Sequence, residues 1–103
     1  MRKHLGIAAA ISAVGLILSA PVQAQDLTKA RYIAANCANC HGTEGRSLGG
    51  IASLAGYSRD QFIRTMKEYK DGTRPASIMH QISKGYTDEQ IEQLAAFFSA
   101  QPK

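Results

Sequence analysis

Apolar residues recur at helical spacing in three stretches of the chain, and no stretch alternates apolar and polar residues as a half-buried strand does. In each stretch the spacing places the apolar side chains on one face of a helix. These positions are Leu27, Ala30, Ile33 and Ala34 within residues 26–36, then Phe62, Ile63, Met66 and Tyr69, and finally Ile91, Leu94, Ala95 and Phe98. The pattern predicts an all-α fold.

Capping signals delimit the second and third of these helices. Ser58 followed by Gln61 fits a capping box, and Gly72 is well placed to end the helix that begins there. Thr87 followed by Gln90 repeats the box before the last apolar stretch. The sequence therefore predicts where both helices begin.

The remaining segments are less regular. Pro75 is placed to open a short additional helix, which Lys84 and Gly85 would close. Residues 41–56 contain several glycines and no usable periodicity, so we interpret them as a loop that wraps around something. We expect three to four helices in one compact domain.

The beginning of the chain has the layout of a secretory signal peptide. Positive residues precede an uncharged apolar run, Leu5–Leu18, and small residues follow as far as Ala24. We expect residues 1–24 to be removed, leaving residues 25–103 as a periplasmic domain without a membrane span. The alternative is an uncleaved anchor, for which the run is short because a membrane span needs about 20 apolar residues.

Charge and size narrow the function. The chain has 12 Lys and Arg residues against 8 Asp and Glu residues, and Arg2 and Lys3 belong to the predicted signal peptide. The domain is thus only mildly basic and lacks a dense basic run, which excludes a typical nucleic-acid binder. A domain this small often needs a disulfide or a cofactor to complete its core, and there is no Trp to fill the centre.

The candidate chemistry is concentrated in "CANCH", where the only two cysteines, Cys37 and Cys40, precede His41. A zinc site would also need His80, but the adjacent residues Cys40 and His41 tend to point in different directions. A thioredoxin-type dithiol occurs in a strand–helix–strand context, and the pattern predicts no strand. A plain disulfide is permitted in an oxidising compartment but leaves the histidine unexplained.

Covalently bound haem accounts for all three residues together. Two thiols at this spacing can add to the two vinyl groups on one edge of the porphyrin, and the next residue then lies where its imidazole can bind the iron. Haem would also supply the apolar centre that so short a domain lacks. The sequence therefore predicts one haem c, with Cys37 and Cys40 as thioethers and His41 as the proximal iron ligand.

The distal side of the iron separates electron carriers from haem enzymes and gas sensors, which need an open position. Met66 falls on the apolar face of a helix, so we interpret it as a core residue. Met79 lies in the irregular segment after Pro75, far enough from His41 for the chain to pass around the haem, and is the predicted distal ligand. His80 is the rival, and only one of these two neighbours can reach the iron.

These features resemble the class I c-type cytochromes over essentially all of residues 25–103. The resemblance is strongest to the haem-bearing subunit of flavocytochrome c sulfide dehydrogenase and is carried by "YKDGTRPASIMHQISKGYTDEQIEQLAAFF", residues 69–98. It implies the compact class I cytochrome c fold around one haem. It also implies that Cys37, Cys40 and His41 form the attachment motif and that Met79 is the distal ligand.

The resemblance further implies a single-electron carrier that accepts electrons from an FAD-containing, sulfide-oxidising flavoprotein subunit and passes them to other redox proteins. It leaves open whether the chain works as a subunit of that enzyme or as a free carrier for a terminal oxidase or another dehydrogenase. Basic side chains could steer a partner to the haem edge. These are Arg46, Arg59, Arg64, Lys67 and Lys70.

One departure from the resemblance concerns the loop after the haem motif. Related cytochromes often carry a proline there, and its backbone carbonyl orients the proximal histidine. The loop "SLGGIASLAG" contains no proline. We expect another carbonyl, around Gly49–Ile51, to accept the second N–H of His41, since a ligating histidine usually donates it to some acceptor.

Overall fold

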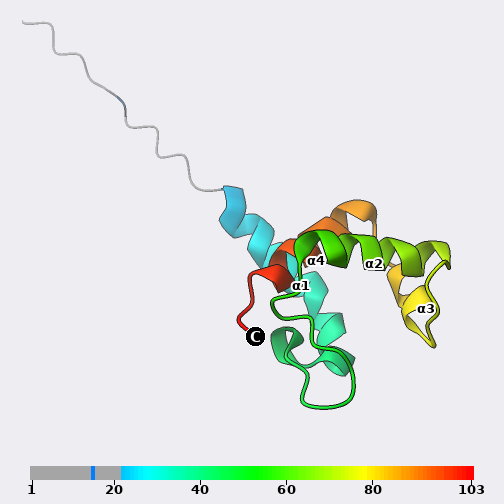
Figure 1. Ribbon diagram of the computed structural model, residues 1–103. Coiled ribbons are helices and arrows are strands. Elements are labelled where there is room, and N and C mark those ends of the chain that lie inside the picture. The colour runs from blue at the N-terminus through cyan, green and yellow to red at the C-terminus, as the bar shows by residue number, and fades with distance from the viewer. Residues whose placement is uncertain (1–14, 16–21) are drawn as a thin grey trace, which may run out of the picture.

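The computed structural model describes Gly15 and residues 22–103 (Figure 1). The elements are α1 (Val22–His41), the 3-10 turn η1 (Thr43–Gly45), α2 (Arg59–Asp71), α3 (Met79–Ser83) and α4 (Asp88–Ser99). These described residues form no strand, which confirms the predicted all-α class. None of their helices has both the length and the apolar character needed to cross a bilayer. The expected signal peptide, residues 1–24, lies almost wholly outside them and stays a prediction.

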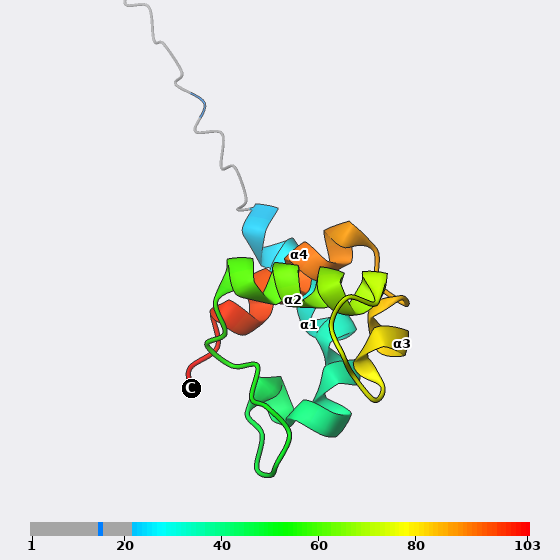
Figure 2. The same ribbon diagram turned by 45° about the vertical axis from the view of Figure 1, so that its right-hand side comes forward.

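The helices pack as a small bundle with one open side. α1 packs against α4, and α2 contacts both α4 and α3. Both views show the loop after η1 at the lower end of the molecule, and Figure 2 shows α3, in yellow, beside the end of α2. The last turns of α1, the loop and α3 therefore surround one region of the structure.

The core lies between α1, α2 and α4. The rings of Phe62 and Phe98 are 5.7 Å apart between centroids, and Phe97 meets Phe98 edge-on at 5.2 Å. The buried residues are Ala30, Ala34, Phe62, Met66, Ile91, Leu94, Ala95, Phe97 and Phe98. The predicted apolar faces of α2 and α4 are thus confirmed as core faces. The prediction is wrong for Leu27, which is 48% exposed.

The two predicted capping boxes have different outcomes. Before α4 the box is present: Thr87 Oγ1 accepts from the Gln90 amide at 3.1 Å, and Gln90 Oε1 accepts from the Thr87 amide at 2.9 Å. Before α2 the prediction is wrong, because the Ser58 side chain makes no capping hydrogen bond. Only its carbonyl takes part, by accepting from the Phe62 amide. Gly72, with a φ of 82°, ends α2 as expected.

Two helices differ from their predicted bounds. α1 continues through the cysteine pair to His41, because nothing breaks it before Gly42, whose φ of 85° is open mainly to glycine. α3 begins at Met79 and not near Pro75. The carbonyl of Ile78 is the one that accepts the first helical bonds of α3, from residues 81 and 82.

Candidate functional site

A cavity of about 360 Å³ opens between the last turns of α1, the loop after η1, α2 and α3. Its walls are mostly apolar, with Leu54, Phe62 and Met66 among the side chains that line it. Within the described part of the chain, no carboxylate, ammonium or guanidinium group lines this cavity. The site is therefore suited to an apolar group and unsuited to a highly charged one.

The structure brings the predicted site residues to this cavity. Cys37 and Cys40 lie three residues apart near the end of α1, which places both thiols on one face of the helix. Both of them, together with His41, line the cavity, and Met79 lines it from the first turn of α3. The rival residue His80 is not among the lining residues, and its Nδ1 atom is buried without a hydrogen-bond partner in the described structure.

The imidazole of His41 is fixed by a backbone carbonyl. Its Nδ1 atom lies 2.6 Å from the carbonyl oxygen of Ala52. Since a carbonyl can only accept, Nδ1 carries the proton and Nε2 keeps the lone pair that a metal ion would bind. The acceptor expected around Gly49–Ile51 is the carbonyl of the next residue, Ala52, where the loop returns to the imidazole.

Burial raises the pKa of two groups that line the cavity, the Cys37 thiol and the Tyr86 hydroxyl. Burial raises the pKa of the Cys37 thiol, although a hydrogen bond with Tyr86 opposes this rise. Burial is also the largest cause of the raised pKa of Tyr86. Sequence reasoning did not find Tyr86 as a cavity residue, because its position before α4 gave no signal beyond helix entry.

The structure does not support two of the alternative interpretations of the cysteine pair, the plain disulfide and the zinc site. Cys37 and Cys40 are free thiols, so they do not form the plain disulfide. A zinc site would need the thiols and imidazoles to converge, and among the residues described here no three His, Cys, Asp or Glu side chains gather as metal ligands.

The cavity fits a large, flat, apolar group that is bonded to the chain and carries a metal. Ile51, Ile78 and Ile82 are 49%, 58% and 36% exposed although they line the cavity, and a plate seated there would cover them. The two thiols offer covalent attachment, the imidazole offers nitrogen ligation, and Met79 offers a soft thioether. This donor set is the one that a c-type haem uses.

Comparisons with known proteins also indicate a covalently bound c-type haem. The family model described as Cytochrome c matches residues 26–101. The chain is 34% identical over 71 residues to the cytochrome subunit of sulfide dehydrogenase from Chlorobaculum tepidum, a match covering 69% of the chain and 64% of that protein. It is 38% identical over 69 residues to cytochrome c-554(548) from Halomonas halodenitrificans, covering 63% of the chain and 83% of the relative.

A further relative is the thiosulfate dehydrogenase electron acceptor from Stutzerimonas stutzeri. It is 32% identical over 95 residues, which cover 84% of this chain and 44% of that protein. The chain thus spans just under two thirds of the Chlorobaculum protein and less than half of the Stutzerimonas protein.

Proposed function

Because the chain belongs to the cytochrome c family, we propose that it carries single electrons in the periplasm from an FAD-containing, sulfide-oxidising subunit to a further redox protein. The family and the relatives give the general part of this function, an electron carrier with a covalently bound c-type haem. The observation that carries the proposal is the meeting of two thiols, an imidazole and a thioether at one apolar cavity.

The covalent attachment is assigned to Cys37 and Cys40. Each thiol would hold the haem through one thioether bond, formed by addition of its S–H across a vinyl group. Their placement on one face of α1 supports this assignment. The next residue, His41, would bind the iron through Nε2, because the carbonyl of Ala52 holds the proton on Nδ1.

The distal iron ligand is assigned to Met79. Its side chain is half-buried and lines the cavity, whereas His80 does not. A thioether ligand in addition to an imidazole would raise the reduction potential, because sulfur favours ferrous iron. A site closed in this way favours electron transfer over the open-site chemistry of a haem enzyme or gas sensor.

The bound haem supplies a one-electron redox centre, and the side chains of the chain set its surroundings. Phe62 and Met66 form a buried wall that excludes water. Ile78 and Ile82 provide the apolar side of α3 next to Met79. A mostly apolar lining of this kind limits the access of solvent to the haem and so contributes to its reduction potential.

The partner is inferred from the Chlorobaculum relative, whose description names sulfide dehydrogenase. Of the five basic residues expected to steer a partner, Arg64 and Lys67 are exposed along α2, and the other three form ion pairs within the chain. Those pairs are Arg46 with Glu44, Arg59 with Glu92 and Lys70 with Asp88. Arg64 and Lys67 are therefore the residues best suited to meet an acidic partner surface.

Sulfide together with an FAD-containing sulfide dehydrogenase subunit from the same organism is expected to reduce the haem-loaded chain rapidly under anaerobic conditions. Reversing the charge of both Arg64 and Lys67 to glutamate is expected to slow this reduction by about tenfold at low salt, because steering raises association rates. Stopped-flow absorbance of the reduced haem bands measures both rates.

Lys29→Glu is the control. It reverses one exposed charge on α1, whereas both changes in the slow double variant lie on α2. Its rate should stay near that of the unaltered chain. Reduction that is no faster than with sulfide alone would contradict the flavoprotein partner. In that case rapid reduction by a thiosulfate dehydrogenase would favour the free-carrier alternative, which the Stutzerimonas relative supports.

Export is proposed from the layout of residues 1–24. The mature protein recovered from the periplasm is expected to begin at Gln25, because the cleavage site ends at Ala24. Intact-mass measurement of the haem-loaded protein gives the first residue directly. A mass that retains the apolar run would instead indicate the anchored alternative.

A further inference from the structure

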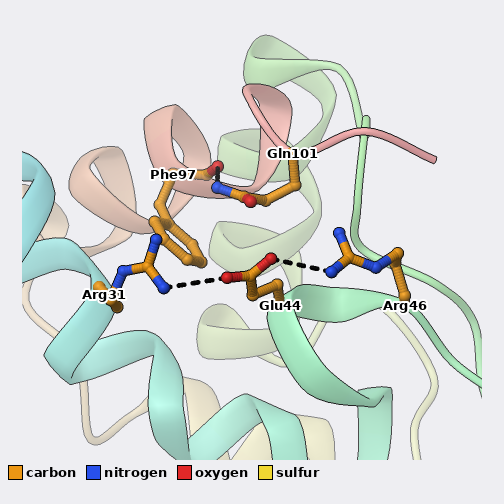
Figure 3. Close-up of polar contacts among 5 residues, drawn as sticks. All are labelled: Arg31, Glu44, Arg46, Phe97 and Gln101. Atoms are coloured by element: carbon orange, nitrogen blue, oxygen red, sulfur yellow. Dashed lines mark hydrogen bonds and ion pairs between the residues drawn. The ribbon is translucent and has the colours of Figure 1, made fainter.

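Glu44 is the only non-glycine residue with a positive φ, 53°, in the part of the chain that the structure describes. This conformation is unfavourable for a residue with a Cβ atom. Two ion pairs hold it: Oε1 lies 2.9 Å from Arg31 Nη1 and Oε2 lies 2.9 Å from Arg46 Nη2 (Figure 3). One carboxylate therefore joins the η1 turn to α1 on one side and to the start of the loop on the other.

One of the two partners of this carboxylate, Arg31, also contacts the core. The guanidinium group of Arg31 lies 5.6 Å from the ring centroid of the buried Phe97, so the contact reaches the core (Figure 3). The hydrogen bonds from Arg46 and then Arg31 lower the pKa of Glu44, which keeps it ionised at neutral pH. The three side chains form one network across the turn.

The residue after Glu44, Gly45, is hydrogen-bonded to the end of the loop at residues 54 and 55. The carbonyl of Gly45 accepts hydrogen bonds from the amides of Leu54 at 2.7 Å and Ala55 at 3.1 Å. Gly45 is buried, and a Cβ atom there would lie 2.8 Å from the ring of Phe98. The turn thus packs directly against the core, and its hydrogen bonds fix the positions of residues 54 and 55.

The same loop carries the acceptor of the His41 proton. Ala52 lies two residues before Leu54, and its carbonyl is 2.6 Å from Nδ1 of His41. A second bond, from the Ser47 amide to Ser53 Oγ at 3.0 Å, joins the two sides of the loop next to Ala52. The position of this carbonyl therefore depends on how firmly the turn is held.

We propose that Glu44 is a positioning residue for His41. It fixes the η1 turn through Arg31 and Arg46, the turn fixes the loop, and the loop presses the Ala52 carbonyl against the imidazole. The inference rests on the proposed role of His41 as proximal ligand. An imidazole whose N–H is held by an acceptor donates more strongly to the metal. Loosening the network should weaken that donation and raise the reduction potential.

Two variants of the haem-loaded protein separate positioning from charge. Glu44→Gln removes a negative charge, whereas Arg46→Gln removes a positive one. In both variants we expect the Nδ1 proton of His41 to exchange with solvent about tenfold faster, as the hydrogen bond opens more often, and the reduction potential to rise. A long-range charge effect alone would shift the two potentials in opposite directions. Proton NMR of the ferrous protein and a redox titration measure these quantities.

Glu68→Gln is the matched control. Glu68 forms a similar ion pair, 2.8 Å from Arg74, and its side chain is 34% exposed against 28% for Glu44. It lies on α2, away from the turn and the loop, so the exchange rate of the His41 proton should not change. Faster exchange in both loop variants with potential shifts of the same sign supports the proposal. Unchanged exchange in either folded variant, or shifts of opposite sign, overturns it.

The experiment also distinguishes this inference from the ligand assignment beneath it. If His41 binds the iron, its ring protons in the unaltered ferrous protein are displaced far upfield by the porphyrin ring current. Their absence from that region would overturn the ligand assignment. Their presence with unchanged exchange would overturn the positioning role of Glu44 alone. If Glu44→Gln fails to fold, Arg46→Gln and Arg31→Gln apply the same two readouts from the other ends of the network.

Discussion

Replacing Cys37 and Cys40 together by alanine is expected to abolish covalent haem attachment completely. The described chain offers no other thiol, so no second route to a thioether exists there. The loss should extend to the fold, because Ile51, Ile78 and Ile82 would be left around an uncovered cavity in a domain with a small core. Soret absorbance that stays with the protein after acid–acetone extraction measures attachment, and the cooperativity of thermal unfolding measures the fold.

The single variants are the controls for this result. Cys37→Ala and Cys40→Ala each keep one thiol on the face of α1 that lines the cavity. We expect both to retain protein-bound haem after extraction, at lower yield. Haem that stays with the double variant after extraction would contradict the thioether assignment and indicate covalent attachment through another side chain.

Met79→Ala is expected to remove the long-wavelength sulfur-to-iron charge-transfer band of the oxidised protein. It should also lower the reduction potential and allow the ferrous protein to bind carbon monoxide readily, because the distal position is then open. The unaltered protein should show the band and resist carbon monoxide. Absorbance spectra of both forms and a redox titration test all three results.

Two variants show whether another residue holds the iron. Met66→Leu keeps the volume of a buried side chain that lines the same cavity, at a cost below about 1.5 kcal/mol, and should leave the band unchanged. His80→Ala should also leave it unchanged. A band that persists in Met79→Ala and disappears in Met66→Leu would transfer the ligand role to Met66, and disturbed coordination in His80→Ala would transfer it to His80.

The parts of the fold that could be predicted are those in which local sequence decides the outcome. The box formed by Thr87 and Gln90 depends on neighbouring residues only, and the stop at Gly72 depends on one backbone conformation. The exposure of Leu27 depends on tertiary contacts, which periodicity does not contain. Helical spacing shows which residues share a face, but not which end of that face the neighbouring helices cover.

The candidate site divides in the same way. The spacing of Cys37, Cys40 and His41 carries its own chemistry, so their meeting at one cavity could be expected from the motif alone. The carbonyl that holds His41 belongs to Ala52, and a backbone acceptor leaves no trace in the side-chain pattern. The ion pairs of Glu44 could not be predicted either, because a charged residue in a glycine-rich loop is usually solvated. Its two partners are known only from the geometry of the turn.

The lining of the cavity bears on what travels with each electron. The described wall holds no carboxylate, ammonium or guanidinium group, and burial keeps the pKa of the Tyr86 hydroxyl above its ordinary value. We therefore expect the reduction potential to change little with pH near neutrality, because this wall offers no acidic or basic side chain of those kinds to take up or release a proton. Such a protein would transfer electrons only, and the proton transfers that accompany oxidation of the substrate would take place on the electron donor.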